Sequence, residues 1–95
     1  IGNASNRLST PRVIFVNTKL QLYVADSGNN RIQLFDRDQS NGSTVVGNGA
    51  PGTIDLNIPM AVTIDSDGYL FISDGYNNRI IGSGPQGYRC IVGCI

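Results

Sequence analysis

The 95-residue sequence contains no histidine and no tryptophan, and its seven basic side chains balance its seven acidic ones. Without histidine, the chain lacks the most common general base and the most common zinc ligand. Without net charge, it has no overall positive field to attract nucleic acid or anionic lipid. We therefore expect no catalytic, metal or cofactor site among these residues and no nucleic-acid partner.

Long hydrophobic runs are also missing. No apolar stretch exceeds five residues, whereas a membrane-spanning helix needs about 18 to 20. We therefore expect no insertion into a membrane. The sequence begins at Ile1, with neither an initiator methionine nor a signal-like stretch, and we expect it to be an internal or processed piece of a longer protein.

What the sequence does contain is an internal repeat. The stretch Leu22–Ile32 reads LYVADSGNNRI, and the stretch Leu70–Ile80, 48 positions later, reads LFISDGYNNRI. Each copy has an apolar run, an Asp, a Gly/Asn loop and an Arg-Ile pair, which is typical of two strands joined by a tight antiparallel hairpin. The same offset relates Leu8 to Leu56 and Pro11 to Pro59. A repeat of this length without helical periodicity predicts one four-stranded propeller blade per unit.

The stretch Leu22–Ile32 resembles the NHL repeat, and Pro11 and Pro59 lie where that family places the start of its innermost strand. The resemblance covers nearly the whole chain as two tandem units. It implies an all-β fold, a β-propeller, of which this chain supplies two four-stranded antiparallel blades. Six blades are common in this family, so the resemblance implies a larger ring.

We expect the first blade at about residues 8–48 and the second at about residues 56–93, with residues 1–7 as the tail of a preceding blade. The expected strands are 13–16, 22–25, 31–35 and 44–46, then 61–64, 69–73, 79–82 and 88–92. Val13 to Val16 are apolar on both faces of the pleat, which favours a strand covered from both sides. Two blades cannot close a ring, because closure takes about four to eight. Further blades would come from a longer chain or from identical copies.

Asp26 and Asp74 occupy matching positions in the two units, so their carboxylates could converge at one face of a ring and act in catalysis or metal binding. A structural role is favoured, because an Asp before a Gly/Asn turn accepts backbone N–H bonds of that turn. Arg31 and Arg79, five residues later, are the expected partners across the hairpin. Repetition in every unit suits a residue that makes the fold, whereas catalysis needs only one copy.

The segment Asp65-Ser66-Asp67-Gly68 resembles the opening of a calcium-binding loop. It lacks the spaced third oxygen donor and the distant Glu of such loops. The first unit has Asn17-Thr18-Lys19-Leu20 at this place, which puts a Lys where a ligand would lie. We therefore expect a turn between the first and second strands of the blade.

Cys90 and Cys94 are the only cysteines. Their spacing excludes the paired CxxC motifs of a zinc site. In a regular strand their Cα atoms would lie about 13 Å apart, whereas a disulfide rarely spans more than about 7 Å. Gly93 could supply a bend, and we favour an intrachain disulfide over reduced packing cysteines or a bridge to a neighbouring chain.

Two glycosylation sequons are present, Asn3-Ala4-Ser5 and Asn41-Gly42-Ser43, both in segments expected at the surface. Chance sequons are common in a chain rich in Asn and Ser. Together with the expected disulfide, they favour an extracellular location.

Three functions remain open. The first is a non-enzymatic propeller scaffold that binds protein or glycan, with Tyr76 as a contact because it stands in a loop where the first unit has Gly28. The second is a structural repeat that assembles into a filament or multimer. The third is a propeller lyase or lactonase whose active-site residues lie outside this segment. The sequence leaves open the ligand, the number of blades and whether one chain or several form the ring.

Overall fold

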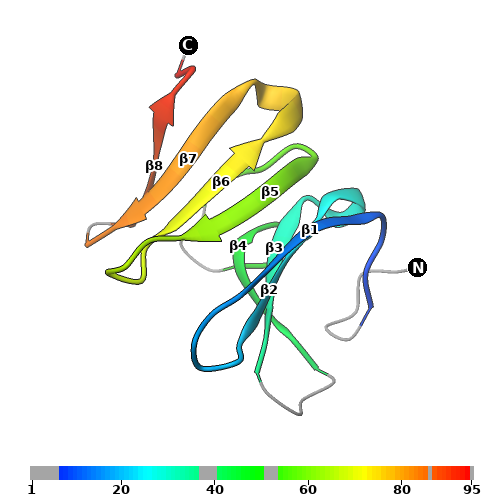
Figure 1. Cartoon of the computed structure of the whole chain (residues 1–95). Coiled ribbons are helices and arrows are strands. Elements are labelled where there is room, and N and C mark those ends of the chain that lie inside the picture. The colour runs from blue at the N-terminus through cyan, green and yellow to red at the C-terminus, as the bar shows by residue number, and fades with distance from the viewer. Residues whose placement is uncertain (1–6, 37–40, 51–53, 86, 95) are drawn as a thin grey trace.

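A computed structural model describes residues 7–36, 41–50, 54–85 and 87–94. These residues form two four-stranded antiparallel sheets, which lie side by side (Figure 1). The first blade contains, in spatial order, β1 (Pro11–Val16), β2 (Leu22–Asp26), β3 (Arg31–Phe35) and β4 (Ser43–Gly47). The second contains β5 (Pro59–Ile64), β6 (Leu70–Asp74), β7 (Arg79–Gly84) and β8 (Gly87–Val92). The predicted all-β class with two four-stranded antiparallel blades is confirmed.

Asn17 and Asp65 shape the turns between the first two strands of each blade. The Asn17 Oδ1 accepts the backbone N–H groups of Lys19 and Gln21 at 2.9 and 3.0 Å. The Asp65 Oδ1 accepts those of Asp67 and Tyr69, both at 2.9 Å. In each turn a side-chain oxygen accepts hydrogen bonds from backbone N–H groups, a role that a backbone carbonyl would otherwise have. Asn and Asp are favoured in turns for this reason.

The connection between the second and third strands differs from the expected tight hairpin. In each blade it is a short 3-10 turn, η1 (Ser27–Asn29) and η2 (Gly75–Asn77), closed by a residue in the left-handed region. Those residues are Asn30 at φ 54° and Asn78 at φ 52°. Asparagine tolerates this conformation better than most residues because its short side chain can bond locally. The strands on both sides of the turn still pair antiparallel, as predicted.

The hydrophobic core lies between the two blades. The strand β5 lies against β1 and β2 of the first blade, and side chains of both sheets meet there. Eight buried residues form this core: Ala25, Ile32 and Val46 from the first blade, and Leu56, Val62, Leu70, Ile72 and Ile81 from the second unit. Burial of these side chains is the main favourable contribution to the packing of one blade on the other.

The sequence predicted that the strand β1 would be covered on both sides, but in this two-blade structure part of it is exposed. Ile14 is 58% exposed and Val16 is 50% exposed, whereas Val24, the direct neighbour of Ile14 on β2, is buried. Within the described ranges, no helix is long and apolar enough to cross a membrane.

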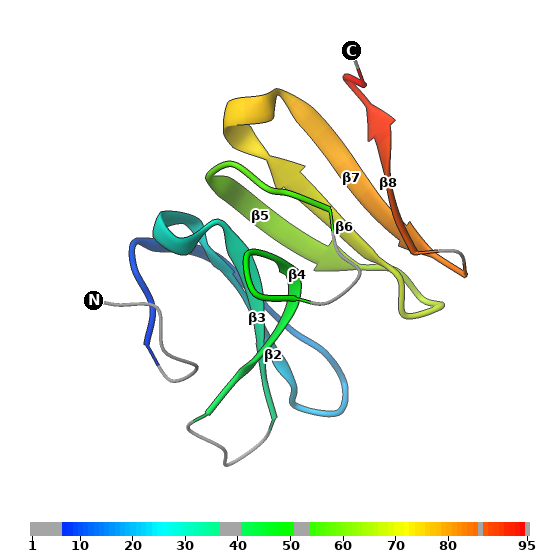
Figure 2. The same ribbon diagram turned by 180° about the vertical axis from the view of Figure 1, so that it is seen from behind.

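The turns of the two blades gather at two ends of the molecule. We call residues 27–30 and 75–78 the η end, and residues 17–21 and 65–69 the turn end. Both views place η1 and η2 at one end and the β1–β2 and β5–β6 connections at the other (Figures 1 and 2).

Candidate functional site

Asp26 lies at the η end and is completely buried. Its Oδ1 accepts the backbone N–H of Ser9 at 2.7 Å. Its Oδ2 accepts the Arg31 Nε at 2.7 Å and the Asn29 Nδ2 at 3.0 Å. The Arg31 Nη2 donates onward to the carbonyl oxygen of Arg7 at 2.8 Å. The pair therefore ties the end of β2, the start of β3 and the segment before β1 together.

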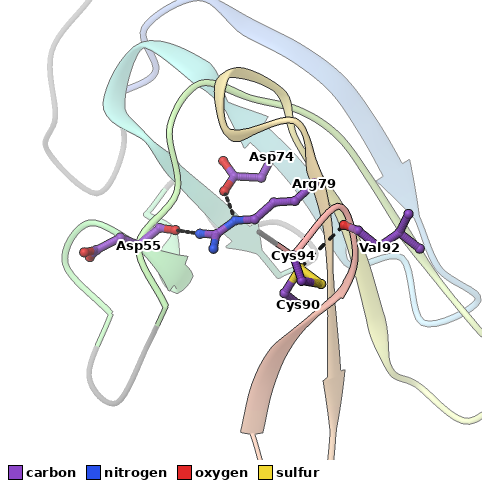
Figure 3. Close-up of a disulfide and its surroundings, with 6 residues drawn as sticks. All are labelled: Asp55, Asp74, Arg79, Cys90, Val92 and Cys94. Atoms are coloured by element: carbon purple, nitrogen blue, oxygen red, sulfur yellow. Dashed lines mark hydrogen bonds and ion pairs between the residues drawn. A yellow bond between two sulfur atoms is a disulfide. The ribbon is translucent and has the colours of Figure 1, made fainter.

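Asp74 repeats this arrangement in the second blade and is also completely buried. Its Oδ1 accepts the backbone N–H of Asn57 at 2.6 Å, and its Oδ2 accepts the Asn77 Nδ2 at 2.9 Å and the Arg79 Nε at 2.8 Å. Figure 3 shows Arg79 between the carboxylate of Asp74 and the carbonyl oxygen of Asp55, which it reaches through Nη2 at 2.7 Å.

The source of the backbone donors differs from the sequence prediction. We expected the N–H groups of the Gly/Asn turn, but Ser9 and Asn57 lie before β1 and β5, and neither η turn has a side-chain cap from its Asp. The Oδ1 atom of each carboxylate therefore binds the segment that precedes the first strand of its blade. Both oxygens of each carboxylate accept hydrogen bonds inside the protein, so neither Asp presents a free oxygen to solvent.

Cys90 lies within β8 and Cys94 follows two residues after the end of that strand, both near Arg79 (Figure 3). Their Cα atoms are 5.6 Å apart and the sulfur atoms are at disulfide distance. Gly93 lies between them at φ 75°, a left-handed conformation that glycine adopts without steric cost. The backbone bends at this residue. The bend brings together two Cα atoms that a regular strand would hold about 13 Å apart.

A cleft of about 600 Å³ opens at the turn end, between the β1–β2 and β5–β6 connections. Phe15, Tyr23 and Ile64 are among its apolar lining residues, while Lys19 and Asp67 come from the two facing turns. Burial raises the pKa of Tyr23 above its usual value, and the negative charge of Asp36 adds to this effect. The cleft is also lined by Val16, Asn17, Thr18, Gln21, Asp65, Ser66 and Gly68.

Sequence reasoning missed this cleft, although one signal was present. Lys19 and Asp67 occupy matching positions of the repeat, 48 residues apart, and they carry opposite charges. Adjacent blades place matching turns next to each other, so such a reversal predicts a cleft with one cationic and one anionic side.

The remaining predicted residues lie elsewhere. Tyr76 is 63% exposed in η2, at the η end, and is therefore not brought together with the cleft. Asn41 is exposed just before β4, and Asn3 lies outside the described residues. In the part of the chain that the structure describes, no three His, Cys, Asp or Glu side chains lie close enough to share a metal ion.

Comparison with known proteins identifies the repeat and the fold. Residues 8–35 match the NHL repeat. The crystal structure of selenomethionine-substituted virginiamycin B lyase from Staphylococcus aureus, a β-propeller, is similar with a TM-score of 0.68 and 22% sequence identity. The match covers 93% of this chain, which spans only 28% of the length of that lyase. No curated protein sequence gave a significant match. The predicted NHL resemblance and propeller fold are confirmed, and the total number of blades stays a prediction.

Proposed function

The chain carries an NHL repeat in a β-propeller fold, and from this premise we propose that it is a non-catalytic scaffold that binds protein or glycan through its loops. The cleft at the turn end is the observation that carries this proposal. Its volume of about 600 Å³ lies in the range of about 300 to 1,000 Å³ that ligand sites occupy.

The chemistry of the cleft favours a ligand with several polar groups. Asn17 and Asp65 use their Oδ1 atoms within their own turns, whereas Lys19 and Asp67 are exposed. An ammonium group and a carboxylate above an aromatic floor suit a ligand that offers acceptors on one side and donors on the other. Peptides and oligosaccharides both have this character.

The two repeated acids support a binding role rather than a catalytic one. A general acid or base must reach the reacting group through a hydrogen bond. Asp26 and Asp74 are buried, and both of their oxygens are bonded to Arg, Asn and backbone donors. The similarity to virginiamycin B lyase concerns the fold and carries no activity over to this chain.

A matched set of charge variants tests the role of the cleft. The purified chain would be applied to an array of defined glycans and to an array of mixed-charge peptides. Lys19→Gln and Asp67→Asn should each weaken binding to the recognised probe by about tenfold, since each removes one charge-assisted bond of about 1.5 kcal/mol. Arg89→Gln removes an exposed charge outside the cleft and should leave binding unchanged. Loss of binding in all three variants alike, or binding to neither array, would refute the proposal.

An extracellular location is part of the proposal, supported by the cysteine pair and by the exposed Asn41 with its sequon. A chain secreted from eukaryotic cells should carry a glycan on Asn41, because the segment before β4 is accessible to a transferase. Intact-mass measurement before and after amide-cleaving deglycosylation would detect it. Asn41→Gln is the control, and a wild type whose mass loss on deglycosylation is no larger than that of this variant would contradict the assignment.

A further inference from the structure

Leu20 occupies a turn position whose backbone conformation favours glycine. Its φ is 61°, in the left-handed region, and its counterpart 48 residues later is Gly68 at φ 89°. In this region the Cβ of an ordinary side chain crowds a neighbouring carbonyl oxygen, so that Gly, Asn and Asp adopt it far more readily than leucine does. The first blade therefore holds a strained residue at a place where the second blade has an unstrained one.

The turn itself does not require the Leu20 side chain. The Leu20 N–H donates to the carbonyl oxygen of Asn17 at 3.0 Å, and the Gly68 N–H donates to that of Asp65 at 3.1 Å. The Asn17 and Asp65 side chains then accept the same two further N–H groups in their own turns. The second blade makes all of these bonds with no side chain at this position. Formation of the turn therefore does not account for the leucine.

The Leu20 side chain lies at the wall of the cleft. Leu20 is 51% exposed, and it stands between Lys19 and Gln21, which both line the cleft. Val16, another lining residue, is also half-exposed. The first blade thus presents aliphatic surface to water beside the Lys19 ammonium group. Strained residues that the fold does not need are concentrated at binding and catalytic sites, so this placement indicates a contact with a ligand.

The chemistry of this wall discriminates between the two kinds of ligand. A sugar hydroxyl placed against an aliphatic side chain loses water and gains no hydrogen bond. An apolar side chain of a peptide gains from the same contact, because both surfaces leave water. A peptide can also supply one charge for Lys19 and the opposite charge for Asp67, which come from the two facing turns.

We propose that the cleft binds a peptide segment in which an apolar side chain lies between an acidic and a basic one, and that Leu20 contacts this apolar side chain. The acidic residue of the peptide pairs with Lys19 and the basic residue pairs with Asp67. The proposal rests on the binding function of the cleft and selects peptide over glycan as its ligand. The strain at Leu20 is then retained for recognition, whereas the Gly68 turn makes no such contact.

Two peptides that differ at one residue test the proposal. Each carries an acidic and a basic residue on the two sides of a variable position, which is leucine in one peptide and serine in the other. In titration calorimetry, the wild-type chain should bind the leucine peptide about tenfold more tightly than the serine peptide. Leu20→Asn should bind both peptides equally, with the lower of the two affinities.

The asparagine variant preserves the turn, because asparagine tolerates the left-handed region and already adopts it at Asn30. Val92→Ala is the matched control. Val92 is an apolar residue that is 60% exposed and lies outside the cleft, so this variant should keep the tenfold preference for the leucine peptide. Loss of the preference in the control as well would overturn the assignment of the contact to Leu20.

Stability measurements separate recognition from a role in the fold. Leu20→Asn and Leu20→Gly should have denaturation midpoints equal to or above that of the wild type, because both relieve the left-handed strain. Lower midpoints in both variants would show that Leu20 supports the fold, and would overturn the proposal.

The binding data also separate this proposal from the function of the cleft on which it rests. If Leu20→Asn kept the preference for the leucine peptide, or if the wild type bound only glycans, the proposal would be wrong. The cleft would still be a binding site in either case, provided that Lys19→Gln and Asp67→Asn weakened binding. Failure of the wild type to bind any peptide or glycan would instead refute the function of the cleft, and this proposal with it.

Discussion

The two blades share the hydrogen bonds around their buried Asp but differ in the exposure of the Arg that this Asp binds. Both contain an Asp that bonds an Arg five residues later, an Asn three residues later and a backbone N–H before the first strand. The Arg31 side chain is 7% exposed, whereas that of Arg79 is 22% exposed. The repeated sequence determines the bonds within a blade, and the neighbouring blade determines how much water reaches them.

The largest expected effect is the loss of stability when either buried Asp is replaced by Ala, and the loss should differ between the two blades. Asp26→Ala should lower the free energy of unfolding by about 3 kcal/mol, because it leaves the Arg31 guanidinium buried without its partner. Asp74→Ala should cost about 2 kcal/mol, because water can reach the more exposed Arg79. Chemical denaturation at one fixed protein concentration measures both. Equal midpoints for the wild type and both variants would show that the acids are not structural and would reopen a catalytic or metal role.

The positions of the strands could be predicted because they follow from local sequence. The repeated apolar runs, Pro11 and Pro59, and the Asp-to-Arg spacing locate the strands to within one or two residues. The η turns could not be distinguished from tight hairpins, since a Gly/Asn pattern suits both and the choice depends on the left-handed Asn30 and Asn78. The exposure of Ile14 could not be predicted either, because it depends on a neighbour rather than on the strand itself.

The candidate site was less predictable than the fold. The partners of Asp26 and Asp74 across the hairpin follow from the spacing of residues in antiparallel strands. Their backbone donors, Ser9 and Asn57, approach from another part of the chain, and no local pattern marks that approach. The cleft exists only where turns of two blades face each other, so its signal lies in a comparison of repeats rather than within either one.

The disulfide gives the second blade a constraint that the first lacks. Thr44 and Asn48 stand where the pattern of β8 has Cys90 and Cys94. The disulfide closes a loop of five residues, and its loss should lower the free energy of unfolding by about 2 kcal/mol in the chain-entropy description. The double variant Cys90→Ser, Cys94→Ser should therefore have a lower denaturation midpoint than the oxidised wild type. Reduction of the wild type should reproduce the loss, and no difference between the oxidised and reduced forms would contradict it.

A smaller effect is expected at the contact between the blades. Ser27 is buried and donates a hydrogen bond to the carbonyl oxygen of Pro59. Ser27→Ala leaves that buried carbonyl without this donor and should cost about 1 kcal/mol. Ser66→Ala, on the exposed turn of the second blade, is the control and should change the free energy of unfolding by less than about 0.5 kcal/mol. Equal losses in the two variants would show that the interblade bond contributes nothing.

The smallest expected effect is a dependence of the stability on pH, which arises from Tyr23 and Tyr88 near the contact between the blades. Burial raises the pKa of Tyr88, with a further increase from Tyr23, and burial followed by the charge of Asp36 raises the pKa of Tyr23. The folded protein therefore holds both phenols neutral at a pH where the unfolded chain, with a pKa of about 10, begins to ionise them. The stability from the neutral phenols is complete below pH 10 and falls as pH rises from there through the raised values of the folded state.

The Tyr88 hydroxyl also donates to the carbonyl oxygen of Val45 in the first blade, at 3.1 Å. Tyr88→Phe should thus lower stability slightly at neutral pH, and the double variant Tyr23→Phe, Tyr88→Phe should show a weaker loss of stability between pH 9 and 11 than the wild type. Denaturant midpoints across that range measure the slope. If the double variant lost stability as steeply as the wild type, the alkaline transition would have to arise from groups other than these two phenols at the contact between the blades.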